Sequence, residues 1–180
     1  RFVRGTDAPD VRAALVPTFG LLLRTHIDLA ESLYRAETES DARTYIVAEM
    51  QRADPGVAKA VLEAALDDVE PSVREVAVTV IGYQSHGKDW TVALQKRLRD
   101  NDSSVRKMSA RSLGWLGAKS AFDELRPLLS DVNSEVRLSA LSAMNRLDKT
   151  KLKSLGVLQK MSQDGDAAVS SMAQRLLMKH

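Results

Sequence analysis

One motif, an Asp separated by four residues from Val-Arg, recurs along this 180-residue chain and limits its possible folds more than any other feature. The Val residues of the motif are Val73, Val105, Val136 and Val169, and Ser replaces Arg in the last copy. Four places after each Val the residue is small, and eight places after it the residue is large and apolar. These residues are Ala77, Ser109, Ala140 and Ala173, then Ile81, Leu113, Met144 and Leu177. Positions four residues apart share one face of an α-helix, so the motif predicts a buried helix that recurs about every 31 residues.

Between these motif helices the sequence predicts another helix in each unit, which is the first helix of its pair, so that the motif helix is the second. In DPGVAKAVLEAALDD, Asp54 is expected to cap the helix, and Pro55 occupies the first helical position, where a missing N–H costs nothing. The segments DWTVALQKRL, AFDELRPLL and KLKSLGVLQKM continue the series, and Pro127 is expected to bend or shorten its helix. Because no pair of helices can bury its apolar stripe alone, we predict an α-solenoid of stacked antiparallel helix pairs, a right-handed superhelical array.

The composition agrees with an all-α fold and excludes several classes of protein. With 44% hydrophobic residues the chain is too apolar to be disordered, and only 4% aromatic residues with many Ala and Leu favour helices over a β-sandwich. The chain has no cysteine, which excludes disulfides, thiol nucleophiles and cysteine-ligated zinc. No apolar run approaches the roughly 20 residues that cross a bilayer.

Two copies of the repeat, LRDNDSSVRKMSARSLGWLG and LLSDVNSEVRLSALSAMNRL, resemble the HEAT repeat, particularly the short HEAT-like form found in bacterial proteins and phycobilin lyases. Weaker copies are LDDVEPSVREVAVTVIG and MSQDGDAAVSSMAQRLL, so the resemblance covers about residues 41–180. We expect a single solenoid domain over residues 1–180, in which residues 1–40 form irregular capping helices. The resemblance implies that the first helix of each pair lies on the convex side of the solenoid and the second helix on the concave side.

The same resemblance implies a structural role for the charged residues of the motif. In HEAT-like repeats the Asp and the Arg form a hydrogen-bonded ladder between successive units. Carried over to this chain, the pairs are Arg43 with Asp68, Arg74 with Asp100, Arg106 with Asp131, and Arg137 with Asp164.

A search for catalytic or metal-binding residues finds no pattern that points to a reaction. The three histidines, His26, His86 and His180, are too scattered to form a metal site. The LGWLG segment lacks the strand and the Gly-Lys-Ser/Thr ending of a phosphate loop, so Gly114 and Gly117 are expected to close a helix. We therefore expect a protein that is not an enzyme and that holds no metal or cofactor.

Residues of the second helices that fall outside the buried stripe are the candidates for partner binding. At 100° per residue, Lys107 and Arg111 lie opposite the stripe and Trp115 lies at its margin. Equivalent places in later units include Arg146 and Arg175, and we predict that all five residues line the concave face. Trp and Arg are frequent interface anchors, so these side chains could grip an acidic or apolar peptide. Packing of Trp115 between repeats is the favoured alternative for that residue.

The charge is unevenly distributed along the chain, which bears on the partner. Residues 1–103 hold 13 basic and 17 acidic residues, whereas residues 104–180 hold 13 basic and 7 acidic residues. We expect a non-catalytic protein–protein interaction or scaffold module. The alternative is nucleic-acid binding through the basic second half, as on the basic concave surface of some HEAT-like DNA glycosylases. A soluble monomer is favoured, in the cytoplasm, or in the periplasm if Arg1 follows a removed signal peptide.

Overall fold

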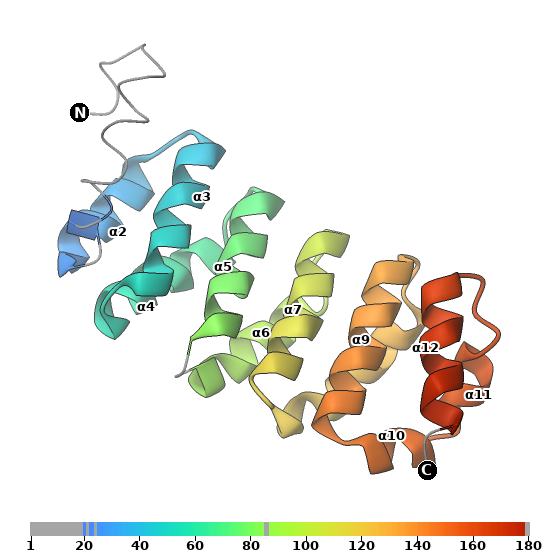
Figure 1. Cartoon of the computed structure of the whole chain (residues 1–180). Coiled ribbons are helices and arrows are strands. Elements are labelled where there is room, and N and C mark those ends of the chain that lie inside the picture. The colour runs from blue at the N-terminus through green and yellow to red at the C-terminus, as the bar shows by residue number, and fades with distance from the viewer. Residues whose placement is uncertain (1–19, 21, 24, 85–86, 179–180) are drawn as a thin grey trace. The chain divides into compact units, whose positions relative to one another are not determined.

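The structure of the protein is a computed structural model that describes residues 20, 22–23, 25–84 and 87–178. Every regular element within these ranges is a helix, and the helices are stacked in pairs (Figure 1). The predicted all-α fold of stacked helix pairs is therefore confirmed. Residues 1–19 of the expected capping segment lie outside the described ranges, as do His86 and His180.

The chain forms two compact units, Arg1–Ala77 and Val78–His180, and the boundary falls inside helix α5 (Pro71–Tyr83). The first unit contains the beginning of α5 and, before it, α2 (Ile27–Ala36), α3 (Ser40–Glu49), the 3-10 helix η1 (Met50–Arg52) and α4 (Pro55–Leu66). Helices α2, α3 and α4 contact one another. Their buried apolar residues include Ala30, Tyr34, Ile46, Val47, Val61 and Leu62.

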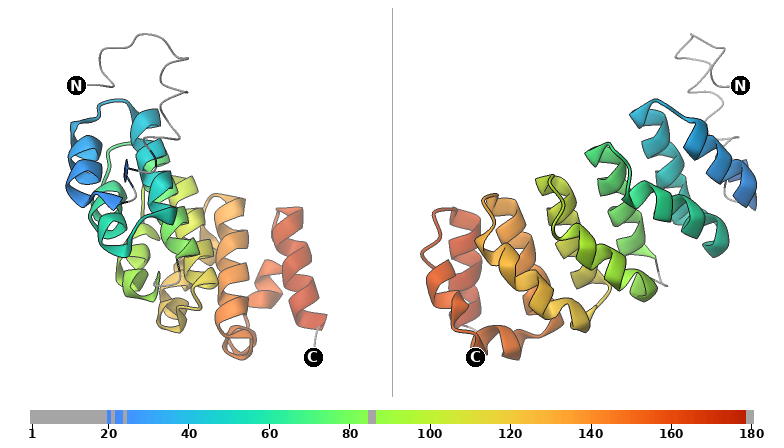
Figure 2. Two further views of the ribbon diagram at one scale, coloured as in Figure 1. Left: turned by 60° about the vertical axis from the view of Figure 1, so that its left-hand side comes forward. Right: turned by 180° about the vertical axis from the view of Figure 1, so that it is seen from behind.

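The second unit begins with the end of α5 and contains two layers of helices. Its elements are η2 (Gly87–Trp90), α6 (Thr91–Arg97), α7 (Ser103–Trp115), η3 (Lys119–Ala121), α8 (Phe122–Leu125), η4 (Arg126–Ser130), α9 (Ser134–Leu147), α10 (Lys149–Ser154), α11 (Val157–Met161) and α12 (Ala167–Met178). Helices α7, α9 and α12 lie side by side in that order, and the shorter helices form the layer behind them (Figure 2). Each long helix thus has one side against the short helices and another side exposed to solvent.

The stripe predicted from the repeated motif forms much of the core. The four Val residues of the motif and the four small residues that follow them are all fully buried. Of the large apolar residues, Ile81, Leu113 and Met144 are also fully buried, but Leu177 is 42% exposed, so its predicted burial is wrong. Near the end of α12 the large apolar residue that is buried is Leu176 instead, because this helix packs against α9 and α11 and leaves the side that carries Leu177 exposed.

Proline and glycine modify the helices, and two of the predictions about them are wrong. Pro127 shortens its helix as predicted, since the four-residue α8 continues as the 3-10 helix η4. The segment KLKSLGVLQKM forms two helices, α10 and α11, because Gly156 adopts a left-handed φ of 66° that interrupts helical hydrogen bonding. Gly114 lies inside α7 and does not close it; a Cβ there would come within 3.0 Å of the Cα of Ala143 in α9. Gly117, with a φ of 64°, follows the end of α7.

Candidate partner-binding surface

Arginine–aspartate pairs join successive repeats and hold the second helices in place. Nε and Nη2 of Arg106 donate to the two carboxylate oxygens of Asp131 at 2.8 and 3.0 Å. Nη1 of Arg106 donates to the carbonyl oxygens of Asp100 and Asn101, just before α7, at 2.8 and 3.0 Å. One planar guanidinium thus ties the start of its own helix to the Asp that precedes the next long helix.

The same bidentate pairing of Arg with Asp occurs in two further places. Nε and Nη2 of Arg137 donate to Asp164 at 2.9 and 2.6 Å. In the first unit, Nε and Nη2 of Arg43 donate to Asp68 at 2.8 and 2.9 Å, and the hydroxyl of Tyr34 also donates to that carboxylate. The structure therefore brings together three of the four residue pairs that the HEAT-like resemblance implies.

The fourth expected pair, Arg74 with Asp100, joins residues of different units and stays a prediction. Within the first unit, Nη1 of Arg74 donates to the carbonyl oxygens of Asp68 and Val69 at 2.8 and 3.0 Å. These are the counterparts of the two carbonyl groups that Arg106 contacts. This part of the ladder geometry therefore recurs at Arg74.

The ladder lowers the pKa of its carboxyl groups. Burial by itself would raise the pKa of Asp131, but hydrogen bonds from Arg106 and from the backbone N–H of Asn133 outweigh it and hold the pKa below its usual value. The hydrogen bond from Arg137 is the main cause of the lowered pKa of Asp164. At neutral pH these groups are charged and already bonded, which suits a structural role better than proton transfer.

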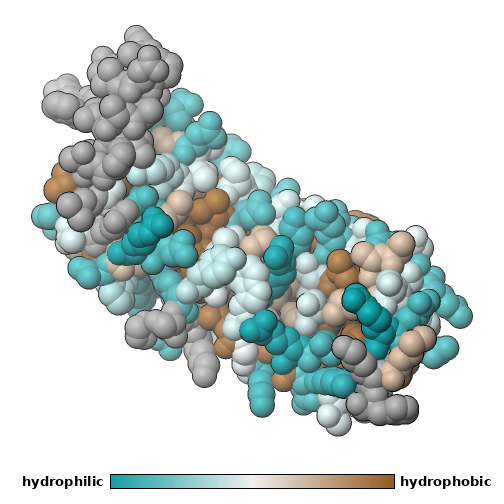
Figure 3. Space-filling model, viewed as in Figure 1, coloured by the Kyte–Doolittle hydropathy of each residue, from teal (hydrophilic) through white to brown (hydrophobic). Residues whose placement is uncertain are grey.

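The solvent-exposed side of α7, α9 and α12 carries the polar residues that belong neither to the core nor to the ladder. Outside the ladder, the three helices carry four basic side chains and one acidic side chain. On the side shown in Figure 3, the part formed by the second unit is mainly hydrophilic, with small apolar areas between polar side chains. We call this surface the α7–α9–α12 face, and its charged and aromatic residues are Lys107, Arg111, Trp115, Glu135, Arg146 and Arg175, together with Tyr83 at the end of α5.

Trp115 contacts two neighbouring side chains on this face. Its ring stacks on the ring of Tyr83, with the centroids 4.8 Å apart and an interplanar angle of 26°. The guanidinium carbon of Arg111 lies 5.1 Å from the centroid of the Trp115 ring, a cation–π distance. Trp115 is partly buried and Tyr83 is 60% exposed. Trp115 therefore packs on a residue of the preceding repeat and still reaches the surface.

Tyr83 is absent from the residues predicted to bind a partner, although the repeat contains the signal that identifies it. Tyr83, Trp115 and Arg146 each follow the Val of their own motif by ten residues. Stacked repeats place equivalent positions next to one another. Comparison of the copies at this position therefore indicates that the two aromatic rings are neighbours and that Arg146 comes next in the series.

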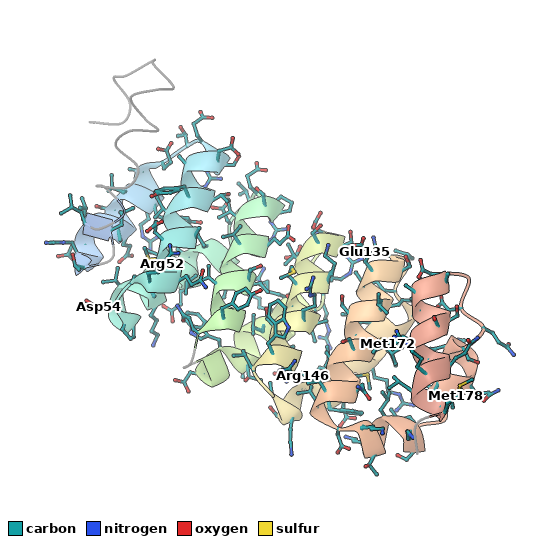
Figure 4. The ribbon with its side chains drawn as sticks, viewed as in Figure 1. Arg52, Asp54, Glu135, Arg146, Met172 and Met178 are labelled. Carbon is teal, nitrogen blue, oxygen red and sulfur yellow. The ribbon has the colours of Figure 1, made fainter. Side chains whose placement is uncertain are left out.

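The basic residues of the α7–α9–α12 face differ in their partners. Nζ of Lys107 donates to the carboxylate of Glu135 at 3.0 Å, which links α7 to α9. Arg146 and Arg175 are exposed, and neither side chain has a hydrogen bond or ion pair with any residue that the structure describes. Figure 4 shows Glu135 near the start of α9 and Arg146 near its end, on the side toward α7. Two guanidinium groups are thus available for an external ligand.

Other kinds of site were sought over the same part of the chain. Within residues 20–178, apart from the undescribed positions, no three His, Asp or Glu side chains are grouped so that they could hold a metal ion. None of the helices described is both long and apolar enough to span a bilayer.

Comparison with known proteins identifies the type of repeat. A family model described as HEAT repeats matches residues 58–145, whereas no curated protein matches the sequence. Among solved structures, an engineered protein has a TM-score of 0.62 at 19% identity, covering 96% of this chain and 91% of that chain. The complex of CpcE and CpcF of phycocyanin lyase from Nostoc sp. has a TM-score of 0.62 at 19% identity, covering 96% and 72%. A designed armadillo repeat protein in complex with the peptide (KR)4 has a TM-score of 0.58 at 18% identity, covering 95% and 94%. At these identities the likeness shows the fold alone.

Proposed function

We propose, from the premise that residues 58–145 are HEAT repeats, that this protein is a non-catalytic module that binds another protein through the α7–α9–α12 face. Stacked helical repeats present extended surfaces and typically use them to bind proteins or peptides. One structure similar to this chain, a designed armadillo repeat protein, is itself a complex with a peptide. The fold thus supports the class of function, and the side chains of the face support its location.

The observation that carries the proposal is the cluster of Tyr83, Trp115 and Arg111. Neither the core nor the ladder requires these side chains, because in the next repeat Arg146 replaces the aromatic residue and Ser142 replaces Arg111. Aromatic and Arg side chains are the usual anchors of protein interfaces. The contacts of Trp115 with Tyr83 and Arg111 also restrict its rotamers in advance, so less side-chain entropy is lost on binding.

The density of charge on the face favours a protein over nucleic acid. Each strand of duplex DNA carries one phosphate per about 3.4 Å. The three helices of the face carry four basic side chains outside the ladder, and one of these, Lys107, is already paired with Glu135. So few cations would neutralise only a small part of a nucleic-acid backbone.

Photo-crosslinking in the cells that produce the protein tests the proposal. A photoreactive amino acid would replace Ser142, an exposed residue in the middle of α9, and in a control it would replace Gln159, which is exposed on α11 in the other layer. We expect a protein adduct at position 142 that is absent at position 159. Equal adducts at the two positions, or adducts to nucleic acid only, would contradict the proposal.

A second variant links the adduct to the face. Arg146→Ala is expected to reduce the adduct at position 142, and because Arg146 is exposed and has no described partner, stability should change by less than about 0.5 kcal/mol. Thermal melting would check that the fold is unchanged. Trp115→Ala is a poorer choice, since it also removes the stack with Tyr83, which contributes roughly 0.5–1.5 kcal/mol.

A further inference from the structure

We infer that the ligand of the α7–α9–α12 face is an extended acidic peptide segment that crosses the three helices and places one carboxylate against each. This inference rests on the proposed function and adds the chemistry of the partner. Its basis is the distribution of guanidinium groups, one on each helix, together with the aromatic pair at one end of the row.

Each long helix of the second unit carries one Arg that is not used by the ladder: Arg111 on α7, Arg146 on α9 and Arg175 on α12. None of the three forms an ion pair with a residue that the structure describes; the polar contact of Arg111 is a 4.0 Å approach to the sulfur of Met108. Guanidinium is planar, always charged and suited to two-pronged binding of carboxylates. The ladder arginines of this protein bind carboxylates in that way.

The repeat places these groups in a row across the helices. Arg111 and Arg175 both follow the Val of their motif by six residues, and Ser142 holds that position in α9. Arg146 is four residues beyond Ser142, about one helical turn of 5.4 Å, a distance that the long Arg side chain can span. Packed helices are about 8–10 Å apart. A peptide in the extended polyproline II conformation advances about 3.1 Å per residue with three residues per turn, so side chains three residues apart share one side and lie about 9 Å apart. Neighbouring guanidinium groups therefore match carboxylates three residues apart in a peptide of this conformation.

The remaining residues of the face agree with this ligand. The stacked rings of Tyr83 and Trp115 lie beside Arg111 and offer an apolar surface to one end of the peptide. Glu135 is the acidic residue of the face, but it is paired with Lys107 and lies eleven residues before Arg146, about 16 Å along the helix. Its charge therefore opposes an acidic ligand mainly at the other end of α9.

Binding of two synthetic peptides to the full chain at low salt tests the inference. The first is a fluorescently labelled nonapeptide of Ser with Glu at the second, fifth and eighth positions, and the second has the same composition with its three Glu residues consecutive. We expect the spaced peptide to bind several times more tightly. The affinity for the spaced peptide should fall about two- to fivefold, the range of an exposed ion pair, in each of the variants Arg111→Ala, Arg146→Ala and Arg175→Ala. Arg126→Ala, at an exposed position of η4, should leave binding unchanged.

Charge reversal tests the register of the peptide. Arg146 lies on the middle helix, so its partner is the middle Glu whichever way the peptide runs. Arg146→Glu should weaken binding of the spaced peptide more than Arg146→Ala does. A peptide with Lys at the fifth position should bind more tightly to the Arg146→Glu variant than to the unchanged protein. Ser142→Arg adds a guanidinium to the row and should tighten binding of the spaced peptide severalfold.

Three results would overturn the inference: equal affinity for the two peptides, no loss on substitution of the three arginines, or preferential binding of a single-stranded oligonucleotide through the same arginines. The crosslinking experiment separates this failure from that of the proposed function. A protein adduct at position 142 combined with equal affinity for the two peptides would retain the binding module and reject the acidic ligand. The absence of a specific protein adduct at position 142, combined with equal affinity for the two peptides, would reject both the binding module and the acidic ligand.

Discussion

Each ladder Arg connects two helical elements through one side chain, and the burial of its ion pair decides how much the pair contributes to stability. The side chains of Arg106 and Asp131 are only 14% and 10% exposed, so solvent screens their interaction weakly. By contrast, the side chains of Lys59 and Glu63, 3.9 Å apart within α4, are 68% and 58% exposed. Exposed pairs of that kind contribute little, whereas removal of one partner from a buried pair leaves a carboxylate without enough hydrogen bonds.

We therefore expect Arg106→Ala to lower the free energy of unfolding by roughly 1–3 kcal/mol, because it leaves Asp131 underbonded. Urea denaturation would measure the change. Lys59→Ala is the matched control, and its effect should stay below about 0.5 kcal/mol. An unchanged urea midpoint for Arg106→Ala would show that the ladder does not stabilise the fold.

The lowered pKa values of Asp131 and Asp164 predict a loss of stability in acid. An Asp in the unfolded chain titrates at about 3.9, above the value of either group in the folded protein. Between the two pKa values the unfolded chain binds more protons than the folded one, so stability rises with pH. The stabilisation from these two groups is complete at pH values above their pKa in the unfolded chain and is lost as pH falls through their pKa in the folded protein.

Urea midpoints measured from pH 7 down to pH 3 should accordingly fall most steeply below about pH 4. Asp131→Asn is expected to be less stable at pH 7 but to lose less on acidification, because the titrating group is absent. A midpoint that is the same at pH 3 and pH 7 would argue against this account.

At the scale of the elements, glycine sets the closest approach of neighbouring long helices. Gly82 and Gly114 each follow the Val of their motif by nine residues. A Cβ on Gly82 would come within 2.8 Å of the Cβ of Ser112, and one on Gly114 would come within 3.0 Å of the Cα of Ala143. Ser112 is held there by the hydrogen bond from its hydroxyl to the carbonyl oxygen of Val78, at 3.0 Å. The absence of a side chain at these two positions therefore permits the observed packing.

Gly82→Ala should lower the free energy of unfolding by roughly 1–3 kcal/mol through overpacking, although Ala favours a helix more than Gly does. Gly56→Ala in α4 is the control, because a Cβ built there would point into open space. That variant should be stabilised by up to about 1 kcal/mol. Thermal or urea unfolding would measure both, and a stabilised Gly82→Ala would contradict the close approach.

At the scale of the whole molecule, the long helices of the second unit differ in how much they bury. Helices α7 and α9 each bury seven residues, whereas α12 buries three. At the position of Gly82 and Gly114, α9 has Asn145, whose buried Oδ1 has no hydrogen-bond partner among the residues described. The stability of a repeat array is approximately the sum of its units and their interfaces. The helix with the smallest buried surface is therefore expected to open first.

Hydrogen exchange should show this order directly. We expect backbone amides of α12 to exchange at least about tenfold faster than those of α9, because local opening of the last helix exposes fewer apolar residues. Asn145→Leu removes the unpaired oxygen and should slow exchange in α12 if the added volume is accommodated. Equal protection of α9 and α12 would instead indicate that the unit opens as a whole.

The amino-acid sequence by itself determined the all-α repeat and most of the core, because a helical face depends only on the spacing of residues along the chain. Burial of Val105, Ser109 and Leu113 and the shortening caused by Pro127 follow from local pattern and local chemistry. The five residues predicted to bind a partner stay a prediction.

Tertiary structure decided what depends on the neighbour of each helix. The stacking of Trp115 on Tyr83, the absence of a described partner for Arg146 and the exposure of Leu177 all depend on which surfaces meet. Gly114 is necessary because of Ala143 in the next long helix, and no spacing within one repeat reveals this. Sequence periodicity indicates which side of a helix is apolar, whereas the residues left at the surface depend on how the helices pack.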